Sequence, residues 1–283
     1  MLMMHATLFP DAIEADKSVE VGSDIVLSDA LALLGSIRAG GAAVIVTDPP
    51  YGIAYHSNHH KDKNPHAPIA NDWNFQIGSF LRAADRALKD GGALYLFTRF
   101  DVYPLWAMEL PPSLSLKNMI VWDKGNHSSG DLTGNFGFRH ELIMFVVKGR
   151  HTLRGKRWPN IWSAARVSHE RLRMPAEKPV LLYERAISSS SDPGDLAVDP
   201  FCGSGTLAEA ARMAGRRFLA GDVDPKMVDL ARRRVGLSTI AHDDEPPVAR
   251  PCPVFNVSPP DPSLWGLHPE DVMEWRGHEQ HKG

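Results

Sequence analysis

The chain alternates short runs of β-branched and small apolar residues with segments whose apolar residues recur at helical spacing. The runs predict strands at residues 24–28, 43–47, 93–98, 117–122, 141–147, 196–199 and 217–220. The periodic segments predict helices at residues 30–38, 75–89, 180–187, 206–214 and 225–235. Strands that alternate with helices in this way are typical of an α/β fold with a mostly parallel sheet.

Two short strings follow predicted strands. Asp48-Pro49-Pro50-Tyr51 comes directly after the strand at 43–47, and Phe201-Cys202-Gly203-Ser204-Gly205-Thr206 comes shortly after the strand at 196–199. Open α/β sheets bind their ligands outside the carboxyl ends of parallel strands. We therefore expect both strings at the carboxyl edge of one sheet.

The glycine string has the chemistry of a cofactor loop. Gly203 and Gly205 allow backbone amides to approach a ligand, and the dipole of the following helix favours negative charge. The spacing is not G-x-G-x-x-G and no Gly-Lys-Ser/Thr follows, which disfavours NAD and ATP. Asp222, at the end of the next strand, can accept hydrogen bonds from a ribose diol. Asp224 precedes Pro225 and is more simply a helix cap.

The string at 48–51 offers a pocket for a flat group with an exocyclic amine. The Asp48 carboxylate and a proline carbonyl can accept two N–H bonds, and the Tyr51 ring can stack. Such acceptors make the nitrogen lone pair of an aromatic amine more available for attack. The alternative is a proline turn with a surface tyrosine, which is the commoner outcome for D-P-P alone.

Composition sets broad limits. With 283 residues, 43% of them hydrophobic, and a net charge of -3, the chain is typical of a soluble globular protein and shows no overall preference for polyanions. Cys202 and Cys252 are its two cysteines, which argues against a disulfide framework. No apolar run reaches membrane-spanning length and the start of the chain does not resemble a signal peptide. We expect a cytoplasmic protein without a membrane partner.

Basic residues gather in one segment, residues 148–173, where Glu170 is the only acid. The segment has little periodic pattern and carries Trp158 and Trp162, so it is predicted to be a binding surface more than a core element. Its bases are Lys148, Arg150, Arg154, Lys156, Arg157, Arg166, Arg171 and Arg173. The alternative is a solvated basic loop.

A second polar segment, residues 52–74, contains His56, His59, His60 and His66, but no Cys or carboxylate set at ligand spacing accompanies them. A polar loop is therefore expected there, and no metal. Cys202 is interpreted as a packing residue of its turn, because no base is placed to activate it.

The two strings, in this order, resemble the S-adenosylmethionine-dependent amino-methyltransferases of DNA. The match is to the permuted subgroup, in which the catalytic half precedes the cofactor half. Further matches are Ser28-Asp29, Asn71-Asp72-Trp73, Trp122-Asp123-Lys124, His140-Glu141, Glu177-Lys178-Pro179 and Gly221-Asp222-Val223-Asp224. The resemblance implies a Rossmann-like methyltransferase fold with circularly permuted motif order: a mostly parallel twisted sheet with helices on both faces.

The resemblance also implies a domain organisation. Residues 1–17 would be an N-terminal extension, 18–147 the catalytic half, 148–174 a basic DNA-recognition insert, 175–236 the cofactor half, and 237–283 a proline-rich acidic tail without catalytic role. Double-stranded DNA would be the partner, bound by the lysine and arginine side chains of the segment 148–173. A homodimer is left open, and neither a partner endonuclease nor the recognition sequence can be inferred.

Site residues carry over in the same way. Asp48, Pro49, Pro50 and Tyr51 would bind and activate the target base. The cofactor would be held by Asp29, Lys178, Asp199, Phe201, Gly203, Ser204, Gly205, Thr206 and Asp222. One departure concerns Met174-Pro175-Ala176-Glu177-Lys178-Pro179, because the family commonly has His-Pro-Thr-x-Lys-Pro there.

The expected activity is methyl transfer from S-adenosylmethionine to the N6 amine of a flipped-out adenine, with S-adenosylhomocysteine as product. An Asp at the first position of the 48–51 string goes mostly with adenine in the resembled family, whereas a Ser goes more often with cytosine N4. Methylation of cytosine N4, of RNA or of a protein amide stays open as a variant. A non-catalytic cofactor- or DNA-binding module of the same fold is the other alternative.

Overall fold

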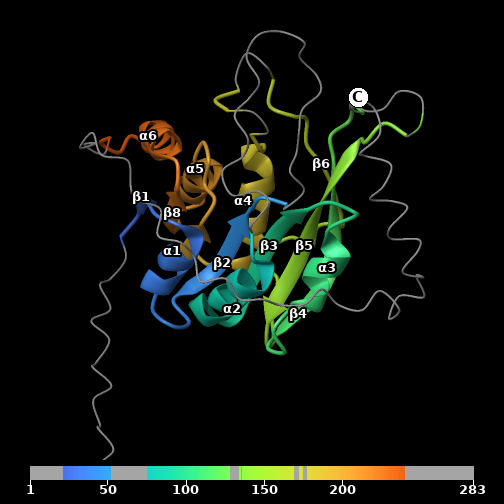
Figure 1. Cartoon of the computed structure of the whole chain (residues 1–283), viewed down its shortest axis with the longest axis horizontal. Helices are drawn as coiled ribbons and strands as arrows, with labels where there is room; N and C mark the ends of the chain where they lie inside the picture. Colours follow the sequence, from blue (N-terminus) through green and yellow to red (C-terminus); the bar gives the residue numbers. More distant parts are fainter. Residues whose placement is uncertain are drawn as a thin grey trace, which may run out of the picture. The chain divides into compact units, whose positions relative to one another are not determined.

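A computed structural model describes residues 22–51, 75–127, 134, 136–168, 172–174 and 177–239, all within one compact unit (Figure 1). The strands are β1 (Asp24–Leu27), β2 (Ala42–Thr47), β3 (Leu88–Thr98), β4 (Leu114–Asp123), β5 (His140–Lys148), β6 (Ile161–Ser163), β7 (Leu196–Asp199) and β8 (Arg217–Asp222). The helices are α1 (Ala30–Ser36), α2 (Ile77–Ala87), α3 (Tyr103–Met108), α4 (Val180–Ser190), α5 (Thr206–Met213) and α6 (Pro225–Arg234).

The strands form one sheet in the order β1-β8-β7-β2-β3-β5-β4-β6. Neighbouring strands pair in parallel except at β5, which is antiparallel to both β3 and β4. The mostly parallel sheet expected from the sequence is therefore confirmed. The parallel strands end at one edge of the sheet, the carboxyl edge, and begin at the opposite, amino edge. β5 runs the other way, so His140 lies at the carboxyl edge and Lys148 at the amino edge.

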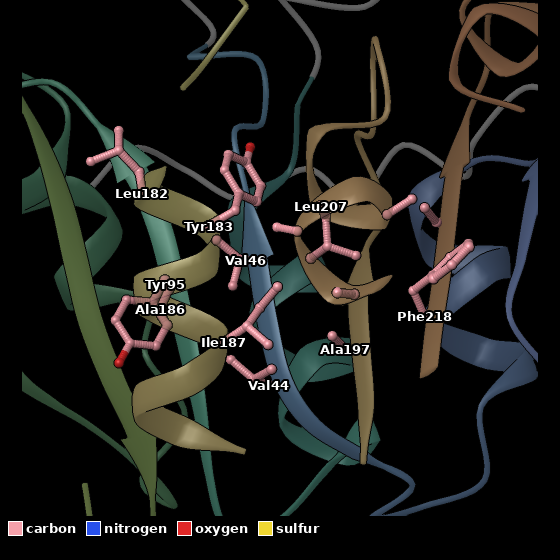
Figure 2. Packing of buried hydrophobic residues seen from close by; sticks show 14 of the residues in the cluster. Val44, Val46, Tyr95, Leu182, Tyr183, Ala186, Ile187, Ala197, Leu207 and Phe218 are labelled. Atoms are coloured by element: carbon pink, nitrogen blue, oxygen red, sulfur yellow. The ribbon is translucent and has the colours of Figure 1, made fainter. Parts of the chain in front are cut away.

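Helices cover both faces of the sheet, as expected. Along β2, Val44 and Val46 belong to the core that contains α4, α5 and α6, whereas Ile45 belongs to the core that contains α1, α2 and α3. This alternation follows from the two-residue period of a strand. Figure 2 shows Val44 and Val46 beside Tyr183 and Ile187 of α4.

The largest difference from the predicted boundaries lies between α2 and β3. A helix was expected through residue 89 and a strand from 93, but α2 ends at Ala87 and β3 begins at Leu88. The pairing with β2 passes from Ala42↔Leu88 to Val44↔Ala93, so β3 has an irregularity between these pairs. Gly91, with φ 74°, lies within it. Apolar periodicity cannot show a strand that begins in a polar, glycine-containing bulge.

The prediction that residues 148–173 form a surface rather than a core element was wrong for β6. Trp162 of β6 is 3% exposed, and its ring lies 6.1 Å from that of Tyr95. Its indole N–H donates to the Pro159 carbonyl at 2.9 Å. A three-residue strand among arginines leaves too short an apolar pattern to detect. The short helix α3 was also not predicted.

Several expectations concern residues outside the described ranges: the extension at 1–17, the histidine-containing loop at 52–74, Arg171, and the tail from residue 240 onward. Within the described residues, the helices are too short or too polar to cross a membrane.

Candidate active site

The strings at 48–51 and 201–206 follow two strands that are neighbours in the sheet. β2 and β7 are neighbours in the sheet, with Val44 opposite Ala197 and Ile45 opposite Val198. At their carboxyl ends the Thr47 hydroxyl donates to Asp199 Oδ1 at 2.7 Å. Asp48 and the glycine loop (residues 201–206) therefore leave adjacent strands at the same edge, as the sequence predicted.

Asp48 is held from two sides. The Tyr51 hydroxyl donates to Asp48 Oδ1 at 2.7 Å, and the Lys178 ammonium donates to Asp48 Oδ2 at 2.6 Å. The Tyr51 ring lies 6.0 Å from that of Trp106 in α3. Burial raises the pKa of Tyr51 well above its usual value, and the nearby Asp48 charge raises it further. Tyr51 is therefore a neutral hydrogen-bond donor, which fixes the orientation of the carboxylate.

Charges of alternating sign continue from Asp48 into the protein. Lys178 Nζ also contacts Glu141 Oε2 at 3.2 Å, and Lys124 Nζ contacts Glu141 Oε1 at 2.5 Å. Burial would raise the pKa of Glu141, but the ammonium groups of Lys178 and Lys124 lower it below the usual value. The pKa of Lys124 is lowered by burial, against the opposing effect of Glu141. Sequence reasoning noted the strings that contain Glu141 and Lys124 but gave neither residue a role.

The glycine loop needs its glycines for backbone geometry. Gly203 and Gly205 have φ angles of 46° and 81°, a region that other residues rarely adopt. Gly205 caps α5, and a Cβ there would come within 2.7 Å of the Ala231 Cβ in α6. The loop can therefore pass close to α6 only as glycine at this position.

Asp222 organises the loop from the end of β8. Its Oδ2 accepts the Gly203 N–H and its Oδ1 accepts the Asp224 N–H, both at 3.0 Å. Burial raises the pKa of Asp222, and these amide hydrogen bonds oppose the rise. Asp224 itself caps α6 by accepting from Lys226 N at 2.8 Å, as predicted.

Asp29 lies beside Asp222 at the carboxyl edge. β1 pairs with β8, and the Ser28 N–H donates to the Asp222 carbonyl at 3.0 Å. Asp29 caps α1 by accepting from the backbone amides of Leu31 and Ala32, and its side chain is exposed. The structure thus brings together Asp29, Asp222, the glycine loop and Asp48 along one edge.

Other predicted cofactor residues support the loop from within the protein. Asp199 is 1% exposed and accepts from Thr47 and from Phe201 N, the latter at 3.1 Å. Burial is the main reason that the pKa of Asp199 rises to about 7. Cys202 is 5% exposed and belongs to the core, in agreement with a packing role.

Ser204 and Thr206 bind an arginine that the sequence did not single out. Arg234 Nη1 donates to Ser204 Oγ at 3.0 Å and to Thr206 Oγ1 at 3.1 Å. On the other side of the loop, the Ser204 N–H points to the Met174 sulfur at 3.1 Å. Thr206 also donates to the Lys178 carbonyl at 3.4 Å. Lys178 therefore contacts the glycine loop through its backbone and Asp48 through its side chain.

The predicted DNA-binding residues are divided between the two edges. Lys148 ends β5 and pairs with Asp85 at 3.2 Å, while Arg154 pairs with Asp192 at 3.3 Å and donates its backbone N–H to Ser189 near the end of α4. These residues lie at the amino edge. Arg150 lies there as well, because its carbonyl would be 3.0 Å from a Cβ on Gly91.

Two of the remaining basic residues of this segment, Arg166 and Arg173, lie close to the site. Arg166 follows β6 beyond Ala164, whose N–H donates to the Asp123 carbonyl at the end of β4. Arg173 pairs with Glu177 at 3.2 Å, directly before Lys178. Lys156 and Arg157 are exposed, and Lys156 Nζ lies 4.4 Å from the centroid of the Trp158 ring. Across the described parts of the chain, no group of His, Cys, Asp and Glu could hold a metal ion.

The fold is an α/β fold, and the string at 48–51 leaves the strand next to the one that leads to the glycine loop. The model of a protein family described as DNA methylase matches residues 42–233. The chain belongs to this DNA methylase family. The match confirms the family expected from the sequence, the S-adenosylmethionine-dependent amino-methyltransferases of DNA.

Individual proteins agree with this assignment. The chain is 27% identical over 256 residues to the DNA adenine methyltransferase YhdJ of Escherichia coli (strain K12). The aligned part covers 76% of this chain and 83% of that protein. The M1.HpyAVI–SAM complex has a TM-score of 0.56 at 19% identity, covering 75% of this chain and 98% of that one. PvuII DNA methyltransferase, which is cytosine-N4-specific, has a TM-score of 0.59 at 15% identity, covering 78% and 89%. These two structures resemble the chain in fold.

Proposed function

We propose that this chain transfers a methyl group from S-adenosylmethionine to the N6 amine of an adenine in double-stranded DNA. The adjacency of β2 and β7 carries the proposal, because it places the Asp48 carboxylate beside the glycine loop. A donor held by the loop and an amine held by Asp48 would then meet in a fixed geometry, which removes much of the entropic barrier to transfer.

The residues along the carboxyl edge fit this donor. Gly203 and Gly205 keep the loop backbone accessible, and Asp222 offers a carboxylate at the end of β8, where ribose hydroxyls bind in α/β folds. Asp29 would lie near the adenine, and Phe201 would supply an aromatic wall. When bound, S-adenosylmethionine supplies a methyl group that is activated by its sulfonium charge. Asp199, Ser204 and Thr206 act by holding the loop.

The target base has to leave the duplex to reach this edge, at a cost of a few kcal/mol. The Tyr51 ring offers a surface on which the extruded base stacks. Asp48 accepts one N–H of the amine and the Pro49 carbonyl accepts the other, so that the nitrogen lone pair is directed away from the ring system. The new carbon–nitrogen bond at N6 would form as the methyl–sulfur bond of the donor breaks, which would leave neutral S-adenosylhomocysteine, and the N6 proton would then leave to Asp48 or to water.

Adenine is the proposed base because Asp stands at position 48. The relative YhdJ is named an adenine methyltransferase, which supports the same choice. Among the described basic residues, Arg166 and Arg173 are best placed to hold DNA phosphates, since they lie at the same edge as Asp48. A cytoplasmic, DNA-associated location belongs to the same proposal, because DNA is the substrate.

The test is a transfer assay with labelled S-adenosylmethionine and unmethylated duplex DNA, followed by digestion and identification of the labelled nucleoside. N6-methyladenine is expected from the wild type, and its loss is expected in Asp48→Ala. Cofactor binding, measured separately by calorimetry, should persist in that variant. N4-methylcytosine would overturn the choice of base. An absence of label despite cofactor binding would instead identify a non-catalytic module.

A further inference from the structure

Two phenylalanines stack on each other at the surface. The rings of Phe100 and Phe138 have centroids 5.6 Å apart and planes inclined by 21°, a stacked arrangement. Phe100 is 52% exposed and Phe138 is 39% exposed. A contiguous apolar surface that faces solvent commonly marks a place where another molecule binds. The pair plays no part in either core of the protein.

The pair lies at the carboxyl edge, on the side of Asp48 that is opposite to the glycine loop. Phe100 comes two residues after the end of β3, and Phe138 comes two residues before the start of β5. β3 and β5 are neighbours, with Thr98 paired to Leu142. Since the strand order is β7-β2-β3-β5, the Asp48 strand separates the glycine loop from the aromatic pair.

Both phenylalanines are joined by short segments to residues that hold the site. Phe100 precedes α3, whose Trp106 ring packs against Tyr51 at 6.0 Å. Phe138 is three residues before Glu141, which contacts the Lys178 ammonium at 3.2 Å. A molecule that binds the two phenylalanine rings would therefore lie directly beside the string at 48–51, which is proposed to bind the target base.

Each phenylalanine is followed or preceded by an arginine with a fixed guanidinium plane. Arg99 forms a two-point interaction with Asp101, at 3.0 and 2.7 Å. Arg139 forms one with Asp123, at 2.7 and 2.9 Å, while its side chain stays 60% exposed. Apolar rings whose sequence neighbours are two oriented guanidinium groups fit a base stack bordered by phosphates better than they fit a lipid surface or an apolar protein helix.

We propose that the Phe100–Phe138 pair enters the base stack of duplex DNA and fills the space that the target base leaves. This rests on the proposed function, which requires an extruded base. Apolar wedges that insert between base steps are a known means of unstacking DNA, and aromatic stacking on a base contributes about 1–3 kcal/mol. That contribution offsets the few kcal/mol that extrusion costs.

The test compares two substrates for Phe100→Ala, Phe138→Ala and the double variant. One is a duplex that contains the methylated site mapped with the wild type. The other is the same duplex with an abasic position opposite the target, so that the base is already unpaired. On the paired duplex we expect kcat to fall by about tenfold in the double variant, consistent with the loss of one stacking contact. On the abasic duplex we expect activity close to the wild type.

Two further variants make the comparison specific. Phe138→Trp retains a stacking ring and should keep most of the activity on paired DNA. Met213→Ala removes a side chain that is 65% exposed at the end of α5, on the amino edge, and should not change either rate. Thermal unfolding and cofactor binding of every variant should match the wild type, because both rings are at the surface.

The outcomes separate this proposal from the proposed function. An equal loss on both substrates, or no loss on either, would overturn the insertion of the pair while wild-type methylation still supports the function. A wild type that methylates neither substrate would overturn both. A fluorescent 2-aminopurine at the target position gives a second readout, because the double variant should lose the signal of extrusion on paired DNA only.

Discussion

The Lys178 ammonium contacts Asp48 at 2.6 Å and Glu141 at 3.2 Å, although the family resemblance assigned this residue to the cofactor. Burial alone would lower the pKa of Lys178, but the carboxylates of Asp48 and Glu141 raise it above its usual value. The ammonium therefore stays charged and compensates the charge of Asp48. We infer that Lys178 is a positioning residue, which orients the Asp48 carboxylate that is proposed to receive the target amine.

Lys178→Met removes this cation and keeps most of the side-chain volume. We expect kcat to fall by about 10- to 100-fold, because a hydrogen bond to a charged group contributes about 1.5–3 kcal/mol. The affinity for S-adenosylmethionine, measured by calorimetry, should change little. Lys178→Arg should recover part of kcat by restoring the positive charge. If Lys178→Met had normal kcat but bound the cofactor more weakly, Lys178 would be a cofactor-binding residue, as the family resemblance implied.

Asp199 gives the stability of the protein a dependence on pH. Burial, with smaller effects of Asp48 and Asp222, raises the pKa of this carboxyl from 3.8 to about 7. Between these values the unfolded chain has released a proton that the folded protein still holds. The contribution of Asp199 to stability is therefore fully present below the lower pKa and is lost as the pH rises through the upper one.

Asp199→Asn keeps an oxygen acceptor for Thr47 and Phe201 but removes the titration. We expect the free energy of unfolding in urea to decrease less for this variant than for the wild type between about pH 4 and pH 7, where one proton changes stability by up to about 1.4 kcal/mol per pH unit. Identical pH dependence in the two proteins would contradict the assignment of this proton to Asp199.

At the scale of elements, α6 is connected to the glycine loop by Arg234. Its side chain is 2% exposed, and Nη1 contacts Glu177 Oε1 at 2.9 Å and the Ser204 carbonyl at 3.1 Å. Its Nε contacts Glu209 of α5. One guanidinium group therefore links α5, α6, the loop and the segment that leads to Lys178.

Arg234→Met leaves the buried Glu177 carboxylate without this partner. We expect a loss of about 3–5 kcal/mol in the free energy of unfolding, the usual effect of breaking a buried ion pair from one side. Adding Glu177→Gln should restore part of the loss, because the uncompensated charge is then removed. If Arg234→Met alone unfolded at the same denaturant concentration as the wild type, the network would have no structural importance.

Sequence patterns predicted the elements that combine apolar periodicity with a clear start or stop. β7 agrees with its predicted limits, and α6 starts at Pro225 after its Asp224 cap, as expected. β6 and α3 were missed because they are only three and six residues long. Their apolar residues, such as Trp162 and Trp106, are fixed by contacts with distant strands and helices, which a local pattern does not contain.

For the whole molecule, the order of strands decides which predicted residues can act together. The strings at 48–51 and 201–206 were recognisable because each is continuous in sequence. The ion-pair network formed by Lys124, Glu141, Lys178 and Asp48 was not recognisable, since its members come from separate segments that meet only in the folded sheet. In the same way, the basic segment contributes residues to both edges: Lys148, Arg150 and Arg154 lie at the amino edge, and Arg166 and Arg173 lie at the carboxyl edge.

The position of these two groups predicts different effects on DNA binding. Arg166 follows β6 at the carboxyl edge, and its charge helps to lower the pKa of Lys124, after burial and against the opposing effect of Glu141. Arg154 lies at the amino edge and is paired with Asp192. The sequence predicted that Arg154 binds DNA as part of the basic segment, whereas the geometry makes Arg166 the better phosphate contact and Arg154 its matched control.

Arg166→Ala should therefore weaken DNA binding and reduce the slope of log affinity against log salt concentration by about one, as expected when one phosphate contact is lost. Arg154→Ala should leave both the affinity and the slope unchanged. The measurement is fluorescence anisotropy with a labelled duplex over a series of salt concentrations. Equal effects of the two substitutions would show that DNA also reaches the amino edge, because a single duplex at the carboxyl edge cannot release counterions through Arg154.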